Sequence, residues 1–207
     1  DWLRRLSRKI GRGPGVTEFI RHALPEIVEV RPPKYGDNRG FFSEVYKRDA
    51  FEAEGISIDW MQDNQSFSAA LGTVRGLHFQ VPPVAQAKLV RVLRGAVYDV
   101  AVDIRKGSPT YGKWVGVELS AEKWNQLFVP IGFAHCFMTV QPDTEVLYKV
   151  SGPYSKEHEG AIRWNDPALG IDWPDPKEKF GVEPTLSEKD AVAPFLADFD
   201  SPFTYKG

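Results

Sequence analysis

Short segments in which apolar and polar residues alternate dominate this chain from about residue 26 to residue 164. Alternation with a period of two is typical of β-strands that bury one face. Sequences rich in glycine, proline and asparagine separate these segments, as expected of turns. Many short strands at this spacing predict an all-β sandwich or barrel, and a jelly roll with a ligand cavity is one such fold. The expected strands are residues 26–31, 41–46, 60–68, 73–80, 87–93, 96–104, 114–119, 126–129, 134–140, 145–150 and 161–164.

Helical patterns are scarce. Residues 49–54 are expected to form a short helix before Gly55, and Ser187 is expected to cap another that begins at residue 188. From Asp166 onward the chain is rich in proline and aspartate, which predicts a tail that wraps the barrel. We therefore expect one domain over residues 16–207, with a few short peripheral helices. Residues 1–15 are expected to be a peripheral extension; a helix on a membrane surface is the alternative for this basic, weakly amphipathic stretch.

Composition indicates an ordinary globular protein: 207 residues, of which 42% are hydrophobic and 26% charged. A net charge of −2 gives no global attraction to nucleic acid or to anionic membranes. Cys136 is the only cysteine, so the chain forms no internal disulfide, which fits a reducing compartment such as the cytoplasm. Because Cys136 lies in an apolar run, we expect an inert core thiol.

The segment 73–80 (TVRGLHFQ) places Arg75, Gly76 and His78 inside a predicted strand. Histidine changes charge close to neutral pH, which suits proton transfer, and a strand is a stiff support for it. Arg75 and His78 fall on opposite faces of a regular strand, so both reach one ligand only if the strand is irregular near Gly76. The alternative for His78, and for His135, is a core histidine with a structural hydrogen bond.

Two further polar residues lie within apolar strands. Lys88 shares a face with two valines in segment 87–93, and Tyr148 does the same in segment 145–150. If those valines line a cavity, the lysine and the tyrosine point into it. For Lys88 the opposite assignment, with residues 89, 91 and 93 inside, is equally consistent with the pattern. For Tyr148 the alternative is a core tyrosine whose hydroxyl bonds the backbone.

Barrels of this kind often bind a metal through two histidines spaced two apart on one strand, together with a carboxylate and a third histidine. Here Gln80 takes the place of the second histidine. The sequence therefore predicts no catalytic metal. Neither a glycine-rich phosphate loop nor a nucleophile-elbow serine is present.

Taken together and in order, several motifs resemble those of the dTDP-4-dehydrorhamnose 3,5-epimerases, which are metal-free sugar-nucleotide epimerases with a cupin-type jelly roll. The resemblance runs from about Phe19 to about Tyr205. The motifs are residues 37–44 (DNRGFFSE), 62–64 (QDN), 75–80 (RGLHFQ), 88–91 (KLVR), 133–135 (FAH), 147–149 (LYK), 164–166 (WND) and 186–190 (LSEKD).

The resemblance implies a role for each matching position. His78 corresponds to the catalytic base, Asp190 to the carboxylate that orients it, Tyr148 to the opposing acid and Lys88 to the cation beside the substrate carbonyl. From the residues alone, Asp190 equally fits a helix start after Ser187, and Asp166 is the second candidate for the base's partner. The implied substrate-binding residues are Arg39 and Glu44, which reach across a homodimer interface, Tyr154, which stacks on thymine, and Gln62, Asn64, Arg75, His135, Glu159 and Lys189.

The implied reaction inverts C3 and C5 of dTDP-4-keto-6-deoxy-D-glucose, giving dTDP-4-keto-L-rhamnose for dTDP-L-rhamnose biosynthesis, without a cofactor. The C4 ketone acidifies both C–H bonds, so the site needs a base, an acid across the ring and a cation near the oxygen. A monofunctional 3- or 5-epimerase of a related dTDP-sugar, a non-catalytic sugar-binding cupin and a metal-dependent cupin oxygenase are the alternatives.

Overall fold

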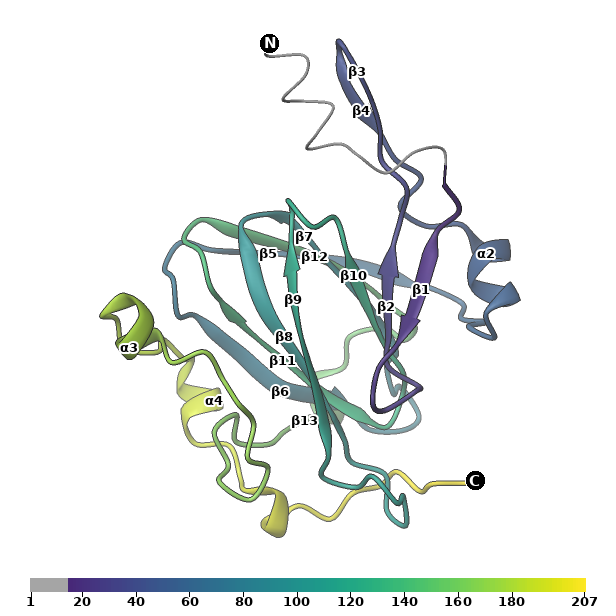
Figure 1. Ribbon diagram of the computed structural model, residues 1–207. Coiled ribbons are helices and arrows are strands. Elements are labelled where there is room, and N and C mark those ends of the chain that lie inside the picture. Colours follow the sequence, from purple (N-terminus) through teal and green to yellow (C-terminus); the bar gives the residue numbers. More distant parts are fainter. Residues whose placement is uncertain (1–14) are drawn as a thin grey trace.

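Two antiparallel β-sheets face each other and form the body of the molecule in the computed structural model, which describes residues 15–207 (Figure 1). The strand order of the first sheet is β1-β2-β10-β7-β12-β5 and that of the second is β13-β6-β11-β8-β9. The first sheet comprises Glu18–Arg21 (β1), Val28–Arg31 (β2), Gln126–Val129 (β10), Lys88–Arg94 (β7), Thr144–Val150 (β12) and Gln62–Ser68 (β5). The second comprises Glu159–Ala161 (β13), Val74–Gln80 (β6), Phe133–Thr139 (β11), Ala96–Asp103 (β8) and Trp114–Ser120 (β9). This all-β architecture with few short helices confirms the predicted fold class.

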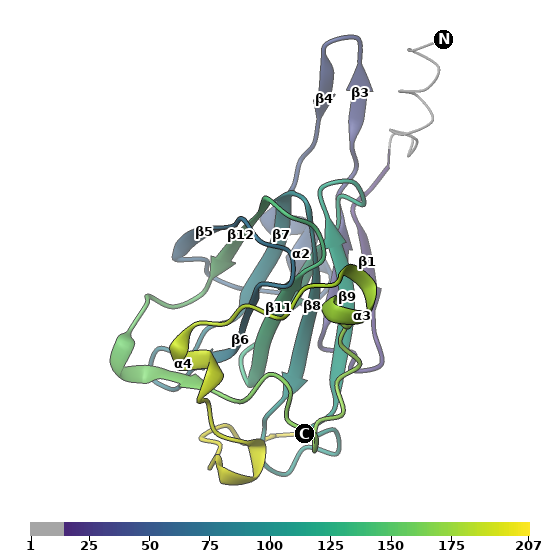
Figure 2. The same ribbon diagram turned by 90° about the vertical axis from the view of Figure 1, so that its left-hand side faces the viewer.

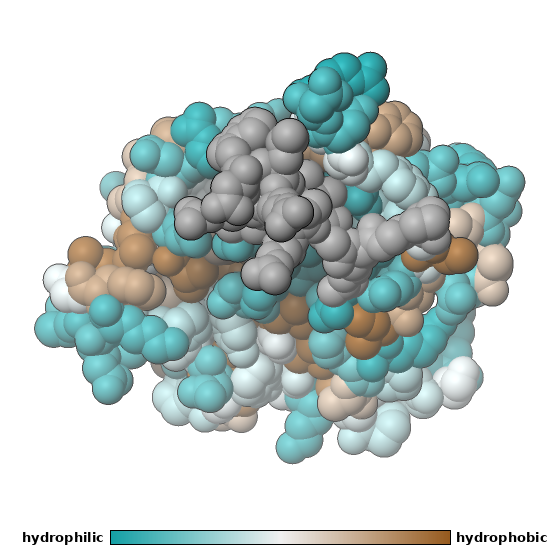
Figure 3. Space-filling model, turned by 45° about the horizontal axis from the view of Figure 1, so that its top comes forward, coloured by the Kyte–Doolittle hydropathy of each residue, from teal (hydrophilic) through white to brown (hydrophobic). Residues whose placement is uncertain are grey.

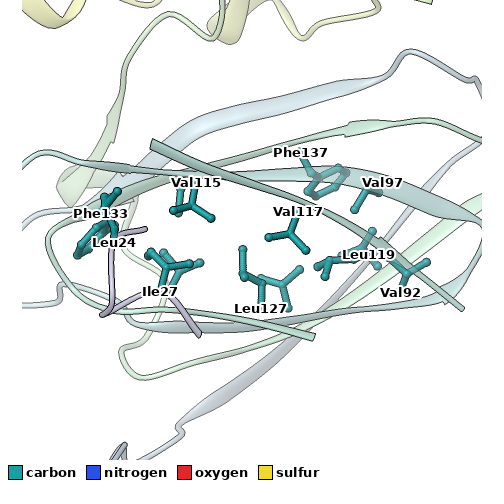
Figure 4. Close-up of a cluster of buried hydrophobic side chains, with 14 residues drawn as sticks. Leu24, Ile27, Val92, Val97, Val115, Val117, Leu119, Leu127, Phe133 and Phe137 are labelled. Carbon is teal, nitrogen blue, oxygen red and sulfur yellow. The ribbon is translucent and has the colours of Figure 1, made fainter. Parts of the chain in front are cut away.

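The main hydrophobic core lies between the two sheets (Figure 4). Alternation along each strand supplies it, because every second side chain points inward. Val92 of β7 and Leu127 of β10 meet Val117 of β9 and Phe137 of β11 there. The deeply buried branched side chains typically contribute about 1.5–3 kcal/mol each on leaving water.

The outer face of the second sheet is covered by the chain after Ile162 (Figure 2). Aromatic and aliphatic side chains of this tail, among them Trp164, Trp173 and Phe203, pack against β6, β8 and β11. The tail carries two short helices, Pro176–Phe180 (α3) and Glu188–Ala191 (α4), and ends after a 3-10 turn at Leu196–Asp198 (η2). It therefore completes a second apolar layer, which also encloses the thiol of Cys136.

The first sheet also has a covered outer face. Helix Arg48–Ala53 (α2) packs Phe51 against Leu89 and Phe128 in a third apolar cluster. Leu89 is thus buried outside the barrel, while its neighbour Val90 belongs to the core between the sheets. Strand β7 therefore carries apolar residues on both faces, because both faces of the sheet are covered there.

A hairpin of Tyr35–Asp37 (β3) and Gly40–Phe42 (β4) projects away from the barrel (Figures 1 and 2). Tyr35, Phe41 and Phe42 keep 42%, 52% and 69% of their surface exposed. The end of the molecule that carries the hairpin shows apolar patches between hydrophilic residues (Figure 3).

Most expected strands are present within a few residues of their predicted bounds, and α2 and α4 lie where helices were expected. Strands β1 and β3 were not predicted, because neither has an alternating apolar pattern: β1 is only half-buried at its two central residues, and β3 is exposed throughout. The expected strand at 41–46 ends at Phe42, after which the Ser43 hydroxyl donates to the Pro33 carbonyl. No helix among residues 15–207 is long and apolar enough to cross a membrane. The predicted extension lies, apart from residue 15, outside the described residues.

Candidate active site

A cavity of about 550 Å³ opens between the sheets and is closed on one side by the tail around α4. Polar and titratable side chains from five strands and the tail meet there. Its lining residues are Ser66, Thr73, Val74, Arg75, His78, Lys88, His135, Phe137, Tyr148, Thr185, Leu186, Ser187, Lys189 and Asp190.

Strand β6 is irregular at the position where the sequence required it. The register with β11 pairs His135 with His78 and Phe137 with Arg75, so three steps along β6 match two along β11. This bulge turns both Arg75 and His78 toward the cavity, as predicted. Gly76 has a φ of +130°, and a Cβ at this position would lie 2.5 Å from the His135 carbonyl oxygen. Only glycine fits this close approach.

The His78 imidazole is paired with a carboxylate. Its Nε2 lies 2.6 Å from Oδ1 of Asp190, and Asp190 is buried. The backbone N–H of Asp190 donates to the Ser187 hydroxyl at 3.2 Å, so Asp190 belongs to a capped helix start as well as to the pair. Burial raises the pKa of Asp190, but the hydrogen bond and charge of His78, together with hydrogen bonds to Ser187 and the backbone of Gly76, outweigh burial and hold this pKa below its usual value.

The second candidate partner, Asp166, has a different task. Its carboxylate accepts hydrogen bonds from the backbone N–H groups of Ala168 at 2.9 Å and Leu196 at 2.7 Å. Both hydrogen bonds connect residues within the tail. Asp166 is therefore a turn residue and not the partner of the imidazole.

Lys88 and Tyr148 both face the cavity. The alternative with residues 89, 91 and 93 inside is wrong. Lys88 is 8% exposed, and burial lowers its pKa to about 8 although the charge of Asp99 opposes the change. Burial raises the pKa of Tyr148, partly opposed by Asn64 and Arg75. The phenol is thus protonated at neutral pH and able to give up a proton, while the ammonium remains largely charged.

A second imidazole–carboxylate pair lies behind Lys88. Nε2 of His135 is 2.9 Å from Oδ1 and 3.0 Å from Oδ2 of Asp99. Burial lowers the pKa of His135 despite the neighbouring carboxylate, so the imidazole is neutral near pH 7. Sequence reasoning missed Asp99. Asp99 could have been found from the sequence, because its carboxylate falls on the same inward face of β8 as Val97 and Ala101.

Several predicted binding residues lie near the cavity without lining it. Gln62 and Asn64 are hydrogen-bonded to each other at 2.6 Å on β5, and the backbone N–H of Tyr154 donates to Gln62 at 3.3 Å. The Tyr154 ring is 58% exposed. Glu159 forms an ion pair at 3.0 Å with Lys189, which does line the cavity.

Arg39 and Glu44 are not brought to the cavity of their own chain. Arg39 lies at the turn of the β3–β4 hairpin, where it pairs with Asp37 at 2.5 Å and its side chain is 85% exposed. Glu44 follows the hairpin and is exposed. Neither residue is buried, and the partner that Arg39 has within the chain, Asp37, lies in the same exposed hairpin.

Within the described part of the chain, no three His, Cys, Asp or Glu side chains are grouped so that they could hold a metal ion. Gln80, which takes the place of a metal-binding histidine, donates from its amide to the carbonyls of Val84 at 2.7 Å and Pro153 at 2.9 Å. Its side chain joins two loops.

An oriented imidazole, a protonated phenol and an ammonium group around one hollow are the groups needed to move protons at carbon atoms beside a carbonyl. Fold and site together define a cupin-type jelly-roll enzyme of acid–base chemistry. The family described as dTDP-4-dehydrorhamnose 3,5-epimerase matches residues 21–198. The chain belongs to this family, whose members are isomerases.

Similar proteins support the assignment. The dTDP-4-dehydrorhamnose 3,5-epimerase of Sinorhizobium fredii is 52% identical over 90% of this chain and 93% of that protein. A solved structure of an epimerase from Legionella pneumophila, in complex with dTDP-4-keto-L-rhamnose, is 42% identical with a TM-score of 0.86 and covers 93% of this chain and 100% of that one. A 3'-monoepimerase from Streptomyces bikiniensis in complex with dTDP-quinovose is 34% identical with a TM-score of 0.78, covering 86% and 87%.

Proposed function

We propose that this protein inverts C3 and C5 of dTDP-4-keto-6-deoxy-D-glucose and so forms dTDP-4-keto-L-rhamnose, a step of dTDP-L-rhamnose biosynthesis. The observation that carries the proposal is the convergence of His78, Lys88 and Tyr148 on one cavity. Membership of the epimerase family supports the same reaction, and so does the Legionella complex with its dTDP-sugar. A non-catalytic sugar-binding cupin has no need of these three groups in one place.

The proposed mechanism begins with His78 as general base. Its imidazole takes the proton from the carbon next to the C4 ketone, and Asp190 at 2.6 Å stabilises the imidazolium that forms. The electron pair moves onto the ketone oxygen, giving an enolate. Lys88 is the cation for that oxygen, and its burial strengthens the interaction because little water competes.

Reprotonation completes each inversion. Tyr148 lies on β12 of the first sheet and His78 on β6 of the second, so the two groups enter the cavity from different sheets. A ring held between them loses a proton on one side and gains one on the other. Tyr148 is suited to the acid role because burial keeps it protonated at neutral pH.

For the nucleotide and sugar we propose the binding residues implied by the family motifs. Arg75 and His135 line the cavity, Lys189 is at its edge with Glu159, and Gln62, Asn64 and Tyr154 adjoin it. Guanidinium groups suit diphosphate oxygens and an exposed aromatic ring suits a base.

We further propose a homodimer in which Arg39 and Glu44 serve the partner's site. Arg39 is exposed at the turn of a projecting hairpin, Glu44 is exposed just after it, and the rings of Phe41 and Phe42 between them are also exposed, which supports a role in contact with a second copy. We retain the cytoplasm as the proposed compartment, since the chain has a single, buried thiol, and one catalytic domain over residues 16–207.

The test is incubation with dTDP-4-keto-6-deoxy-D-glucose in D2O, followed by proton NMR, with and without a chelator. We expect deuterium at both C3 and C5, and no exchange at either with His78→Ala. Exchange at one position only would identify a monofunctional epimerase. Loss of activity on chelation would contradict the proposed mechanism, and absence of exchange in the unaltered protein would reject an epimerase altogether.

A further inference from the structure

Two amide side chains of β5, those of Gln62 and Asn64, lie on the same face of the sheet as the phenol proposed as the acid. In the antiparallel pairing of β5 with β12, Asn64 is directly opposite Tyr148. Side chains of directly opposed residues share a face of the sheet and lie within contact distance. Gln62 is two residues before Asn64 and therefore on the same face.

Hydrogen bonds fix the direction of both amides. The backbone N–H of Tyr154 donates to Oε1 of Gln62 at 3.3 Å, and a backbone N–H can only donate. The nitrogen of Gln62 is therefore its free end, and it donates to Oδ1 of Asn64 at 2.6 Å. With its oxygen occupied in this way, the remaining hydrogen-bonding group of the Asn64 side chain is its Nδ2, which is a donor.

We propose that Gln62 and Asn64 form a hydrogen-bond relay that positions the hydroxyl of Tyr148, with Nδ2 of Asn64 donating to the phenol oxygen. This inference rests on the proposed function, in which Tyr148 is the acid. It assigns the two amides a task beyond the substrate contacts implied by the family motifs. They are positioning residues, because they act on the reaction through Tyr148.

The direction of the relay decides where the acidic proton points. When Asn64 donates to the phenol oxygen, the phenol keeps its own hydrogen free for the cavity. With the amide reversed, the Asn64 oxygen would accept that hydrogen and turn it away from the substrate. Once the proton has been transferred, the same Nδ2 donor stabilises the phenolate that remains. The pKa of Tyr148 is consistent with a donor at Asn64: burial raises this pKa, and the interactions with Asn64 and Arg75 oppose the rise.

The relay is tested by titrating Tyr148 in the protein without substrate. The probe is ¹³C-labelled tyrosine, whose Cζ chemical shift reports ionisation; the Tyr148 signal is the one of seven that Tyr148→Phe removes. The variants Gln62→Met, Asn64→Leu and their combination are neutral, so no new charge enters. Gln65→Met is the matched control, since Gln65 is exposed on the opposite face of the same strand.

We expect Asn64→Leu to lower the acid dissociation constant of Tyr148 about tenfold, and so to raise its pKa, because the phenolate loses one hydrogen bond to a charged group. Gln62→Met should act in the same direction, and the double variant should show no more than Asn64→Leu alone, because Gln62 acts through Asn64. Additive effects of the two substitutions, or effects no larger than that of Gln65→Met, would overturn the relay.

Measurements of kcat, KM and deuterium exchange distinguish a failure of the relay from a failure of the proposed function. With the relay broken, we expect kcat for epimerisation to fall while deuterium exchange through His78 persists. If Asn64 and Gln62 only touch substrate, KM rises and the substrate-free titration does not move, which rejects the relay. If Tyr148→Phe leaves epimerisation intact, the acid role itself fails, whatever the titration shows.

Discussion

Replacing Lys88 with methionine is expected to stabilise the fold while removing most of the activity. Lys88 is 8% exposed, and burial lowers its pKa from 10.5 to about 8. By the relation between pKa and free energy, keeping this ammonium charged in the folded state at neutral pH costs about 3 kcal/mol. Methionine has a similar length and no charge, so Lys88→Met should raise the free energy of unfolding at neutral pH by about 2–3 kcal/mol.

The size of this stability gain depends on pH, and it changes between about pH 8 and pH 10.5. The unfolded chain holds the lysine proton up to about 10.5, whereas the folded protein releases it near 8. Between these values the unfolded state binds more protons, so the unaltered protein gains stability as pH rises. The advantage of Lys88→Met should therefore shrink to about 1 kcal/mol or less by about pH 10.

Urea unfolding at neutral pH and near pH 10 measures this difference directly. Lys156→Met, at an exposed lysine, is the matched control and should show no such pH-dependent gain. Steady-state assays should show Lys88→Met losing on the order of 10²–10³-fold in kcat, since it removes the cation for the enolate oxygen. A variant that is less stable than the parent at neutral pH, or a difference that is the same at both pH values, would show that the buried ammonium of Lys88 does not destabilise the fold.

Three further outcomes follow from the site. Asp99→Asn removes the negative charge that raises the pKa of Lys88, so the pKa of Lys88 should fall below about 8. The alkaline limb of the kcat/KM profile should then move to lower pH, and an unmoved limb would contradict this coupling. Gly76→Ala should destabilise the fold by several kcal/mol in thermal melts, because its Cβ would meet β11 at 2.5 Å. Gly170→Ala, with a φ of +58° and open space, should cost only about 1 kcal/mol, and equal losses would show that the close approach does not matter. Asp190→Asn should lower kcat by about 10²–10⁴-fold, and an unchanged kcat would remove the carboxylate from the mechanism.

The strands that the sequence predicts are those with one or two covered faces. Strands β7, β8 and β11 could be located because burial on both faces makes most of their residues apolar. Strands β1 and β3 have no such imprint, since pairing with a neighbouring strand, rather than burial, makes them strands. Alternation also could not choose between the two faces of β7, because Leu89 and Val90 are buried on opposite sides of the same sheet.

The site could be predicted in part. The irregularity at Gly76 follows from the need to bring Arg75 and His78 to one side, and the register confirms it. The partner of His78 lies 112 residues further along the chain, and no local pattern encodes that contact. Only the family resemblance favoured Asp190 over Asp166, and the geometry places Asp190 against the imidazole.

The proposed mechanism requires that His78 and Tyr148 act on one sugar ring from two sides of the same cavity. The most direct measurement is to follow Tyr148→Phe with the keto-sugar in D2O, comparing deuterium incorporation with the formation of inverted product by proton NMR. We expect incorporation to continue through His78 while inversion is strongly impaired. Loss of both to the same extent would contradict the assignment of the phenol as the acid.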